Sequence, residues 1–139
     1  MLIGIGTDIV DVERIKNAAE KYGSRFVDRI FTKTEQEYCN SFKEGKFQHY
    51  AARFAAKEAF SKAIGTGIAR GFKFNEIGVV NDSSGEPYLV LTGATADKWG
   101  HAKTHISLSH TSSLAIAVIT LEEIDSVERK SEQDVINDG

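Results

Sequence analysis

The sequence predicts an α+β fold in a single domain, with an antiparallel sheet packed against helices. Helical spacing is concentrated in the first half of the chain and strand patterns in the second half, and this grouping is typical of α+β proteins. A chain of 139 residues fits one domain. Its 41% hydrophobic and 27% charged content is that of an ordinary globular protein and excludes a disordered or fibrous one.

The N-terminal region predicts a strand followed by two helices. Residues 2–10 alternate β-branched and small side chains, as a strand does. Apolar residues then recur at helical spacing over 11–22, where Asp11 can serve as the N-cap and Gly23 as the stop. A second, short helix is expected over 25–31.

Two further helices are expected before the pattern changes. Thr32 and Glu35 stand at capping-box spacing and mark the start of the third helix. A longer helix is expected over about 47–64, ended by the glycines of "GTG" (65–67). These glycines either only stop the helix or form a loop whose N–H groups meet a phosphate.

The second half predicts strands and one short helix. Residues 72–80 have the pattern of a strand, and "NDSSGEPY" (81–88) is a turn that leads to a strand over 88–91. A short helix is expected at 93–100. Residues 104–121 give two apolar strands separated by the polar "SHTSS".

The charge is unevenly distributed along the chain. The net charge is −3, but residues 122–139 carry seven acidic and two basic side chains and show no sustained periodicity. We therefore expect a mildly basic domain over 1–121, which suits an anionic partner, and an acidic tail over 122–139. The bias is too weak to indicate nucleic acid.

Cysteine usage and the N-terminus predict the compartment. Cys39 is the only cysteine, which excludes an intramolecular disulfide and a cysteine zinc site and favours a reducing compartment. The N-terminus lacks the basic start of a signal peptide, and no apolar run approaches the ~20 residues of a membrane helix. We expect a cytoplasmic protein with no membrane contact.

The first candidate site is "RFAAKEAFSKA" (53–63). Glu58 and Lys62 are i,i+4 neighbours on a helix and could form an ordinary surface ion pair. The small and apolar residues beside the carboxylate favour the wall of a cleft instead. Arg53 and Lys57 form a second such pair on the adjoining face, and Lys57 is expected to be a solvated charge.

Asp8 adds a second carboxylate. Within "GIGTDIV" (4–10) it comes after two glycines, so its carboxylate can reach an edge where the backbone approaches a ligand. The alternative is that Asp8 caps the next helix, but Asp11 can serve as that N-cap. Magnesium typically takes one or two protein carboxylates together with substrate phosphates. Asp8 and Glu58 are therefore candidate magnesium ligands, and Lys62 would neutralise phosphate charge.

The third candidate is "HISLSHT" (105–111). Strand alternation puts His105, Ser107 and Ser109 on one face, and His110 falls in the turn. Such groups suit a phosphate or a proton-transfer site, although a single histidine is more often structural. No nucleophile triad is evident, because no positioned acid accompanies the histidines.

Together, "GIGTDIV", residues 53–71, "GEPY" (85–88) and "HISLSHT" resemble the holo-acyl-carrier-protein synthases, in order and spacing, across residues 1 to about 121. The resemblance implies transfer of the phosphopantetheine arm of coenzyme A to a serine of apo-acyl carrier protein, with adenosine 3′,5′-bisphosphate as the other product. The acidic tail has no counterpart in the family's usual short form.

The resemblance also implies roles for single residues. Asp8 and Glu58 would hold Mg²⁺, and Lys62 would lie by the coenzyme's pyrophosphate. The proton acceptor stays open among Glu58, a metal-bound water and His105; a free imidazole or metal-bound water is favoured, because a metal-bound carboxylate is a poor base. The remaining positions that match the coenzyme pocket are Arg53, Gly65, Thr66, Gly67, Pro87, Ser109, His110 and Thr111.

Finally, the resemblance implies partners. Family members are typically homotrimers with coenzyme A bound between subunits. Their carrier is strongly acidic, so its docking would depend on salt; Arg14, Arg25, Phe26 and Arg29 match the docking surface. Two other hypotheses are a non-catalytic coenzyme-binding protein, which would bind without transfer, and a magnesium-dependent phosphate hydrolase, which would release the bisphosphate without a carrier.

Overall fold

The computed structural model of the chain describes residues 1–65 and 72–124. Its elements in chain order are β1 (Leu2–Asp11), α1 (Val12–Tyr22), α2 (Ser24–Ile30), α3 (Lys33–Asn40), α4 (Lys46–Ala63), the 3₁₀ helix η2 (Phe74–Glu76), β2 (Ile77–Asn81), β3 (Pro87–Leu91), α5 (Gly93–Trp99), β4 (Ala102–His110) and β5 (Leu114–Glu123).

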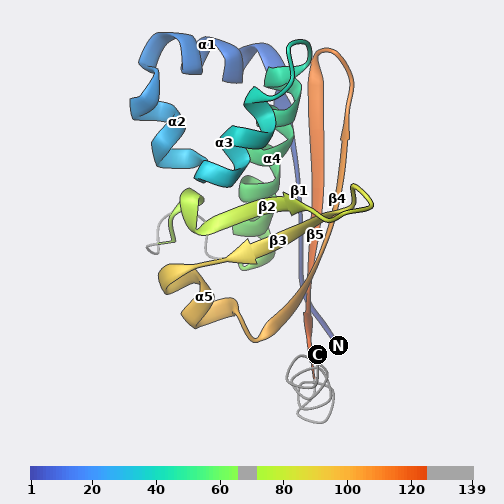
Figure 1. Cartoon of the computed structure of the whole chain (residues 1–139). Coiled ribbons are helices and arrows are strands. Elements are labelled where there is room, and N and C mark those ends of the chain that lie inside the picture. Colours follow the sequence, from blue (N-terminus) through green and yellow to red (C-terminus); the bar gives the residue numbers. More distant parts are fainter. Residues whose placement is uncertain (66–71, 125–139) are drawn as a thin grey trace.

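The strands form two separate antiparallel sheets (Figure 1). β5 lies between β1 and β4 in a three-stranded sheet, and β2 pairs with β3 in a hairpin. The helices α1 to α4 lie on one side of the three-stranded sheet, with α4 against β1 and β5. The α+β class and the antiparallel sheets expected from the sequence are therefore confirmed.

Two glycines let β1 lie directly against α4. A Cβ atom added to Gly4 would collide with the backbone of Ala63, and one added to Gly6 would collide with the backbone of Ala59. Side chains alternate along a strand, so Asp8 shares the face of Gly4 and Gly6. Close approach at the glycines therefore brings Asp8 to the surface of α4.

Most of the expected boundaries agree with the structure. Thr32 and Glu35 form the capping box: the Glu35 N–H donates to the Thr32 hydroxyl at 3.1 Å, and the Thr32 N–H donates to the Glu35 carboxylate at 2.9 Å. Asp11 is the N-cap residue of α1, but its side chain makes no capping hydrogen bond. Instead, the Val12 N–H at the start of α1 donates to the carbonyl of Ser113 at 2.9 Å.

One strand prediction is wrong over its first half. Residues 72–80 were expected to be continuous strand, but the chain forms a 3₁₀ turn at Phe74–Glu76 and β2 begins only at Ile77. The cause is a tertiary contact. The ammonium of Lys57 in α4 donates hydrogen bonds to the carbonyl oxygens of Phe74 and Ile77, which turns this backbone towards the helix.

Candidate active site

Asp8, Glu58 and Lys62 come together where β1 crosses α4. Lys62 Nζ donates to Asp8 Oδ1 at 3.1 Å and to the carbonyl oxygen of Thr7 at 3.0 Å. The Asp8 side chain is 18% exposed, whereas the Lys62 side chain is 55% exposed and contacts Asp8 from the solvent side. Glu58 lies one turn earlier on α4, half-buried, within electrostatic range of both.

The electrostatics of this cluster are those of crowded negative charge. Burial raises the pKa of Glu58, the nearby Asp8 carboxylate raises it further, and Lys62 and Arg14 oppose both effects. A divalent cation would relieve this repulsion. The described residues contain no group of three or more His, Cys, Asp or Glu side chains able to hold a metal, so a closed protein cage is absent from that part of the chain. Two carboxylates fit the other class of site, in which phosphate oxygens complete the magnesium shell.

Two of the residues expected to line the coenzyme pocket, Arg53 and Pro87, lie on the side of α4 that faces β2. Arg53 is buried; its guanidinium donates to the side-chain oxygen of Asn81 at 2.7 Å and lies over the ring of Tyr38. Asn81 pairs with Pro87 across the β2–β3 ladder, so Pro87 belongs to the same region. Arg53 Nε finds no hydrogen-bond partner within residues 1–65 and 72–124.

His110 lies beside His49, which in turn contacts Arg53. The two imidazole rings are 5.6 Å apart, and Arg53 also donates to the His49 carbonyl at 3.3 Å. Burial lowers the pKa of His49, and the charges of Arg53 and His110 lower it further. Phe42 stacks on His49 with ring centroids 4.0 Å apart. The result is an aromatic and cationic cluster of the kind that suits an anionic or planar ligand.

The other expected pocket residues divide into two groups. Gly65 follows Ile64, the C-cap of α4, with a positive φ of 75°, and its N–H donates to the Lys62 carbonyl. Thr66 and Gly67 lie outside the described residues. Ser109 lies in β4, paired with Ile116, and Thr111 begins the β4–β5 turn; His110, expected in the turn, is instead the last residue of β4, paired with Ala115. The Thr111 hydroxyl accepts hydrogen bonds from backbone N–H groups within that turn, at 3.0 and 3.2 Å.

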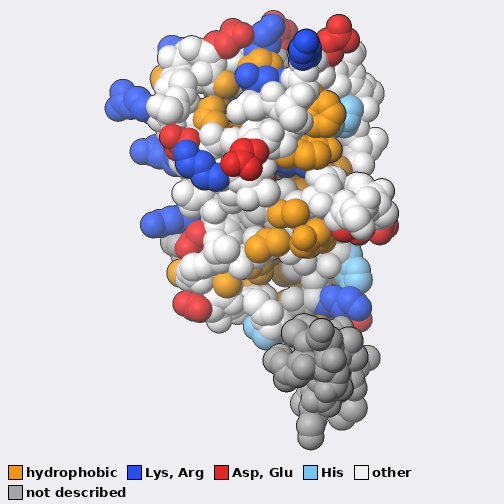
Figure 2. Space-filling view, in the orientation of Figure 1, with side chains coloured by type: hydrophobic (Ala, Val, Ile, Leu, Met, Phe, Trp, Pro, Cys, Tyr) orange, Lys and Arg blue, Asp and Glu red, His pale blue; other side chains and the backbone are white. Residues whose placement is uncertain are grey.

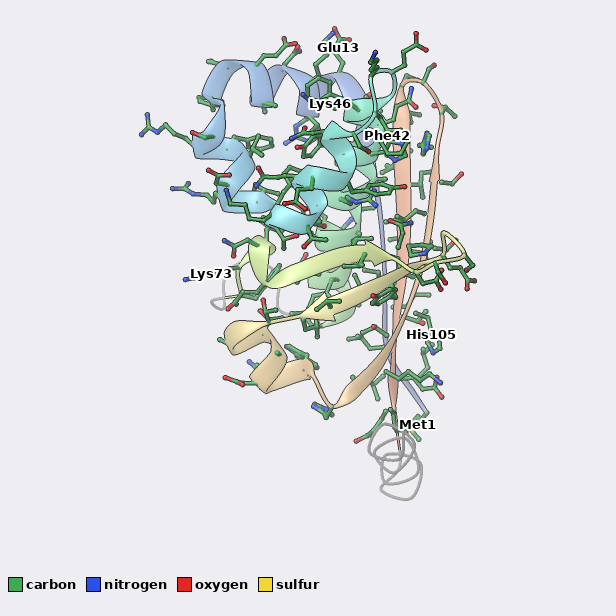
Figure 3. All side chains as sticks on the ribbon, in the orientation of Figure 1. Met1, Glu13, Phe42, Lys46, Lys73 and His105 are labelled. Atoms are coloured by element: carbon green, nitrogen blue, oxygen red, sulfur yellow. The ribbon has the colours of Figure 1, made fainter. Side chains whose placement is uncertain are left out.

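His105 lies on the opposite face of the three-stranded sheet from Asp8. Its alternation with Ile106 and Leu108 is as expected: His105, Ser107 and Ser109 are exposed and the two apolar residues are half-buried. Figure 3 shows His105 on the side of the sheet away from the helices. Its ring nitrogen lies 3.0 Å from the carboxylate of Glu122. Within one chain, therefore, the sheet separates His105 from Glu58.

The expected docking residues lie on α1 and α2. Arg25, Phe26 and Arg29 line a surface cavity of about 460 Å³ together with Tyr22 and Ile30. Figure 2 shows Lys and Arg side chains projecting along this edge of the molecule. Arg14 is exposed on α1 and lies close enough to Glu58 to influence its pKa. Basic and apolar groups thus share one surface on α2, and Arg14 on α1 lies within electrostatic range of Glu58.

One sequence interpretation is contradicted. Lys57 is fully buried rather than solvated, because its ammonium is paired with the buried carboxylate of Glu35 at 2.7 Å. Sequence reasoning also missed Tyr38, His49 and Asn81, which surround Arg53. Only Asn81, at the start of the polar "NDSSG" turn, carried any signal in the sequence.

Comparisons with known proteins show the family of this chain. A family model described as the 4′-phosphopantetheinyl transferase superfamily matches residues 4–119. A holo-[acyl-carrier-protein] synthase of Ruminiclostridium cellulolyticum is 48% identical and aligned over 91% of this chain and 96% of its own length. One of Geobacter metallireducens is 44% identical, over 89% and 100%.

Solved structures agree. A holo-(acyl-carrier-protein) synthase of Bacillus anthracis in complex with CoA (3′,5′-ADP) has a TM-score of 0.76 at 37% identity, covering 89% of this chain and 99% of its own. The Neisseria meningitidis synthase has a TM-score of 0.78 at 38% identity, covering 88% and 100%. The chain therefore belongs to the 4′-phosphopantetheinyl transferase superfamily, among the holo-[acyl-carrier-protein] synthases, and is an enzyme of that family.

Proposed function

We propose that this enzyme transfers the 4′-phosphopantetheine arm of coenzyme A to a serine hydroxyl of apo-acyl carrier protein, in a magnesium-dependent reaction. The products are holo-acyl carrier protein and adenosine 3′,5′-bisphosphate. The observation that carries the proposal is the junction of Asp8, Glu58 and Lys62 between β1 and α4. Two carboxylates and a lysine at one rim have the chemistry that a bound pyrophosphate requires.

Asp8 and Glu58 would hold Mg²⁺ in this proposal. When bound, the metal would neutralise pyrophosphate charge and stabilise the charge that develops on the leaving group. The Lys62 ammonium has hydrogen-bonding capacity beyond Asp8 and the Thr7 carbonyl, so it can donate to a phosphate oxygen from its exposed position.

The reaction exchanges one phosphorus–oxygen bond for another. The serine oxygen attacks the phosphorus that carries the pantetheine arm, and the bond from that phosphorus to the bridging oxygen breaks. The bridging oxygen leaves on the bisphosphate with the bonding electrons, and the hydroxyl proton passes to a base. His105 is one candidate base by its ordinary pKa range. Because the sheet separates it from Glu58 within a chain, His105 could act only at the site of a neighbouring subunit.

We further propose a homotrimer whose sites lie between subunits. The face of the three-stranded sheet that α4 does not cover is apolar on β1 and β5, where sheets facing water usually carry polar residues. Its exposed apolar residues are Ile3, Ile5, Ile9, Leu114 and Ile116. Sedimentation equilibrium should give three times the chain mass, and Ile9→Lys should dissociate the assembly and abolish activity. A fully active monomer would contradict the shared site.

The carrier would dock on the basic and apolar surface of α2 and on Arg14 of α1, which lies within electrostatic range of Glu58. Arg14, Arg25 and Arg29 attract an acidic partner, and Phe26 supplies apolar contact.

The structure has no helix, among the residues it describes, that is long and apolar enough to cross a membrane. With Cys39 as the sole cysteine, we place the reaction in the reducing cytoplasm.

Intact-mass spectrometry tests the proposal directly. Apo-carrier incubated with enzyme, coenzyme A and Mg²⁺ should gain the mass of the phosphopantetheine arm, and one equivalent of bisphosphate should appear. Omitting Mg²⁺ or using Glu58→Gln should suppress both signals, while Glu37→Gln, an exposed change on α3, should not. No mass gain with folded protein and several different carriers would refute the function.

A further inference from the structure

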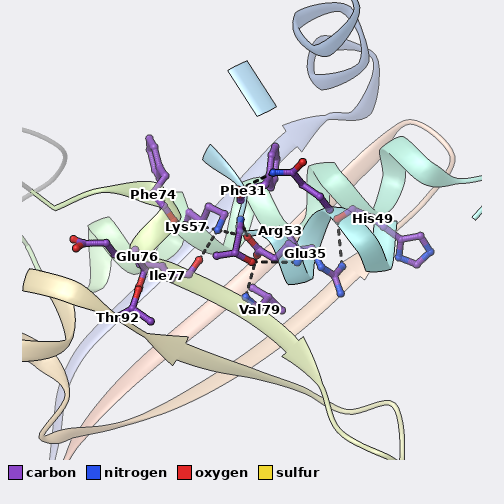
Figure 4. A network of polar contacts seen from close by, with 12 residues as sticks. Phe31, Glu35, His49, Arg53, Lys57, Phe74, Glu76, Ile77, Val79 and Thr92 are labelled. Carbon is purple, nitrogen blue, oxygen red and sulfur yellow. Dashed lines mark hydrogen bonds and ion pairs between the residues drawn. The ribbon is translucent and has the colours of Figure 1, made fainter. Parts of the chain in front are cut away.

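Beneath the coenzyme side of α4 lies a buried ion pair that the proposed reaction does not use (Figure 4). Lys57 Nζ and Glu35 Oε1 are 2.7 Å apart, and both side chains are fully inaccessible to solvent. Lys57 also donates to the carbonyl oxygens of Phe74 and Ile77. All three of its N–H groups are therefore used.

Glu35 is equally well satisfied. One carboxylate oxygen accepts from Lys57 and from the Thr32 N–H, and the other accepts from the Val79 N–H at 3.0 Å. The pair thus joins four elements: Glu35 comes from α3, Lys57 from α4, and their backbone partners from η2 and β2. In Figure 4 these dashed contacts form one connected network.

Core stability alone is a poor explanation for such a pair. Removing two charges from water is costly, and well-packed apolar residues of similar size often hold a core equally well. An apolar pair would still leave the Val79 N–H and the Ile77 carbonyl without these partners in the interior. The charges do what apolar groups cannot: they fix the start of β2 in one orientation.

The end of β2 is fixed by the same helix. Arg53, one turn before Lys57, donates to Asn81 at 2.7 Å, and Asn81 in turn donates to the carbonyl of Gly85 at 3.0 Å. Pro87 lies opposite Asn81 in the ladder. Lys57 therefore holds the start of β2, the first strand of the hairpin, and Arg53 holds its end.

We infer that Lys57 and Glu35 are positioning residues for coenzyme A: they hold β2, and with it Pro87 of the hairpin, in one arrangement beside Arg53. This rests on the proposed function, because Arg53 and Pro87 line the coenzyme pocket only within that proposal. The residues that contact a ligand must themselves be held closely by the residues behind them.

The test compares Glu35→Gln, Lys57→Met and the double variant with two exposed controls on α3, Glu37→Gln and Lys33→Met. Glu35→Gln should raise KM for coenzyme A about tenfold, the size expected from one lost charge-assisted contact. KM for the carrier should change by less than about twofold, because the docking surface on α2 is untouched. The controls should match wild type in both constants.

The double variant separates positioning from stability. It leaves no unpaired buried charge, so its Tm should recover relative to Lys57→Met, while KM for coenzyme A stays raised. If Lys57→Met does not fold, Glu35→Gln and the double variant still decide the question. Lowered Tm with an unchanged KM for coenzyme A, or recovery of Tm and KM together, would overturn the inference.

Calorimetric binding of coenzyme A separates this inference from the proposed function. If wild type binds the coenzyme but transfers nothing to any carrier, the proposed function fails and the binding constants of the variants still test the pair. If wild type transfers the arm and Glu35→Gln binds coenzyme A as tightly as wild type, only the inference about the pair fails.

Discussion

Gly6→Ala should separate the two carboxylates of the site without touching either. A Cβ at position 6 would lie 2.8 Å from the backbone nitrogen of Ala63 and 2.9 Å from the carbonyl carbon of Ala59, and would overlap that carbonyl's oxygen. These atoms belong to the backbone of α4, so no side chain can rotate away. β1 must therefore move off the helix and take Asp8 with it.

The size of the effect follows from these contacts. Overpacking in a core costs about 1–3 kcal/mol, and a clash with helix backbone belongs at the upper end. About 3 kcal/mol corresponds to a Tm roughly 10 °C lower for a domain of this size. Misplacement by about 1 Å near the reacting groups can cost on the order of 100-fold in rate. We expect both losses.

Thermal unfolding by circular dichroism and initial rates of carrier modification, measured well below the Tm, would supply the data. Gly78→Ala is the matched control, because a Cβ at that strand position meets its nearest neighbour at an ordinary 3.5 Å. The control should stay within about 0.5 kcal/mol of wild type, as changes without a clash usually do. A Gly6→Ala enzyme as stable and as active as Gly78→Ala would refute the close approach of β1 to α4.

Three further predictions follow from charge and burial. In metal-free enzyme, the raised pKa of Glu58 means that its ionisation opposes folding, so the free energy of unfolding should fall as pH rises from 4.5 through the folded pKa. Urea titrations should show this step in wild type and not in Glu58→Gln. That variant should also lose roughly 100-fold or more in turnover. Burial raises the pKa of Cys39 to about 12, so a thiol reagent at pH 8 should label it only after unfolding; rapid labelling of the native protein would contradict its burial. Arg29→Glu should raise KM for the carrier about tenfold at low salt, with a smaller effect at high salt and no change in KM for coenzyme A; a salt-independent effect would argue against electrostatic docking.

Much of the fold could be predicted from local patterns. The capping box at Thr32 and Glu35 and the strict alternation of 105–109 are local features, and the structure agrees with both. The η2 turn could not be predicted in this way, because its cause is the distant ammonium of Lys57. Likewise, Glu35 is recognisable as a capping residue, but nothing local indicates that the same carboxylate also binds Lys57 and the Val79 N–H.

The site depends on which face of α4 each charge occupies, and spacing alone does not distinguish these faces. Rows of i,i+4 residues on this helix lie against different neighbours: the alanine row that includes Ala59 meets β1, and the row that includes Arg53 and Lys57 meets β2. A helix buried on several faces has no single apolar stripe, so charge is a poor guide to exposure on it. The row that contains Glu58 and Lys62 is the one that reaches the edge of the site beside Asp8. Lys57, which ties the helix to β2, and Glu58, which is proposed to bind metal, are therefore adjacent in the sequence but point about 100° apart around the helix axis.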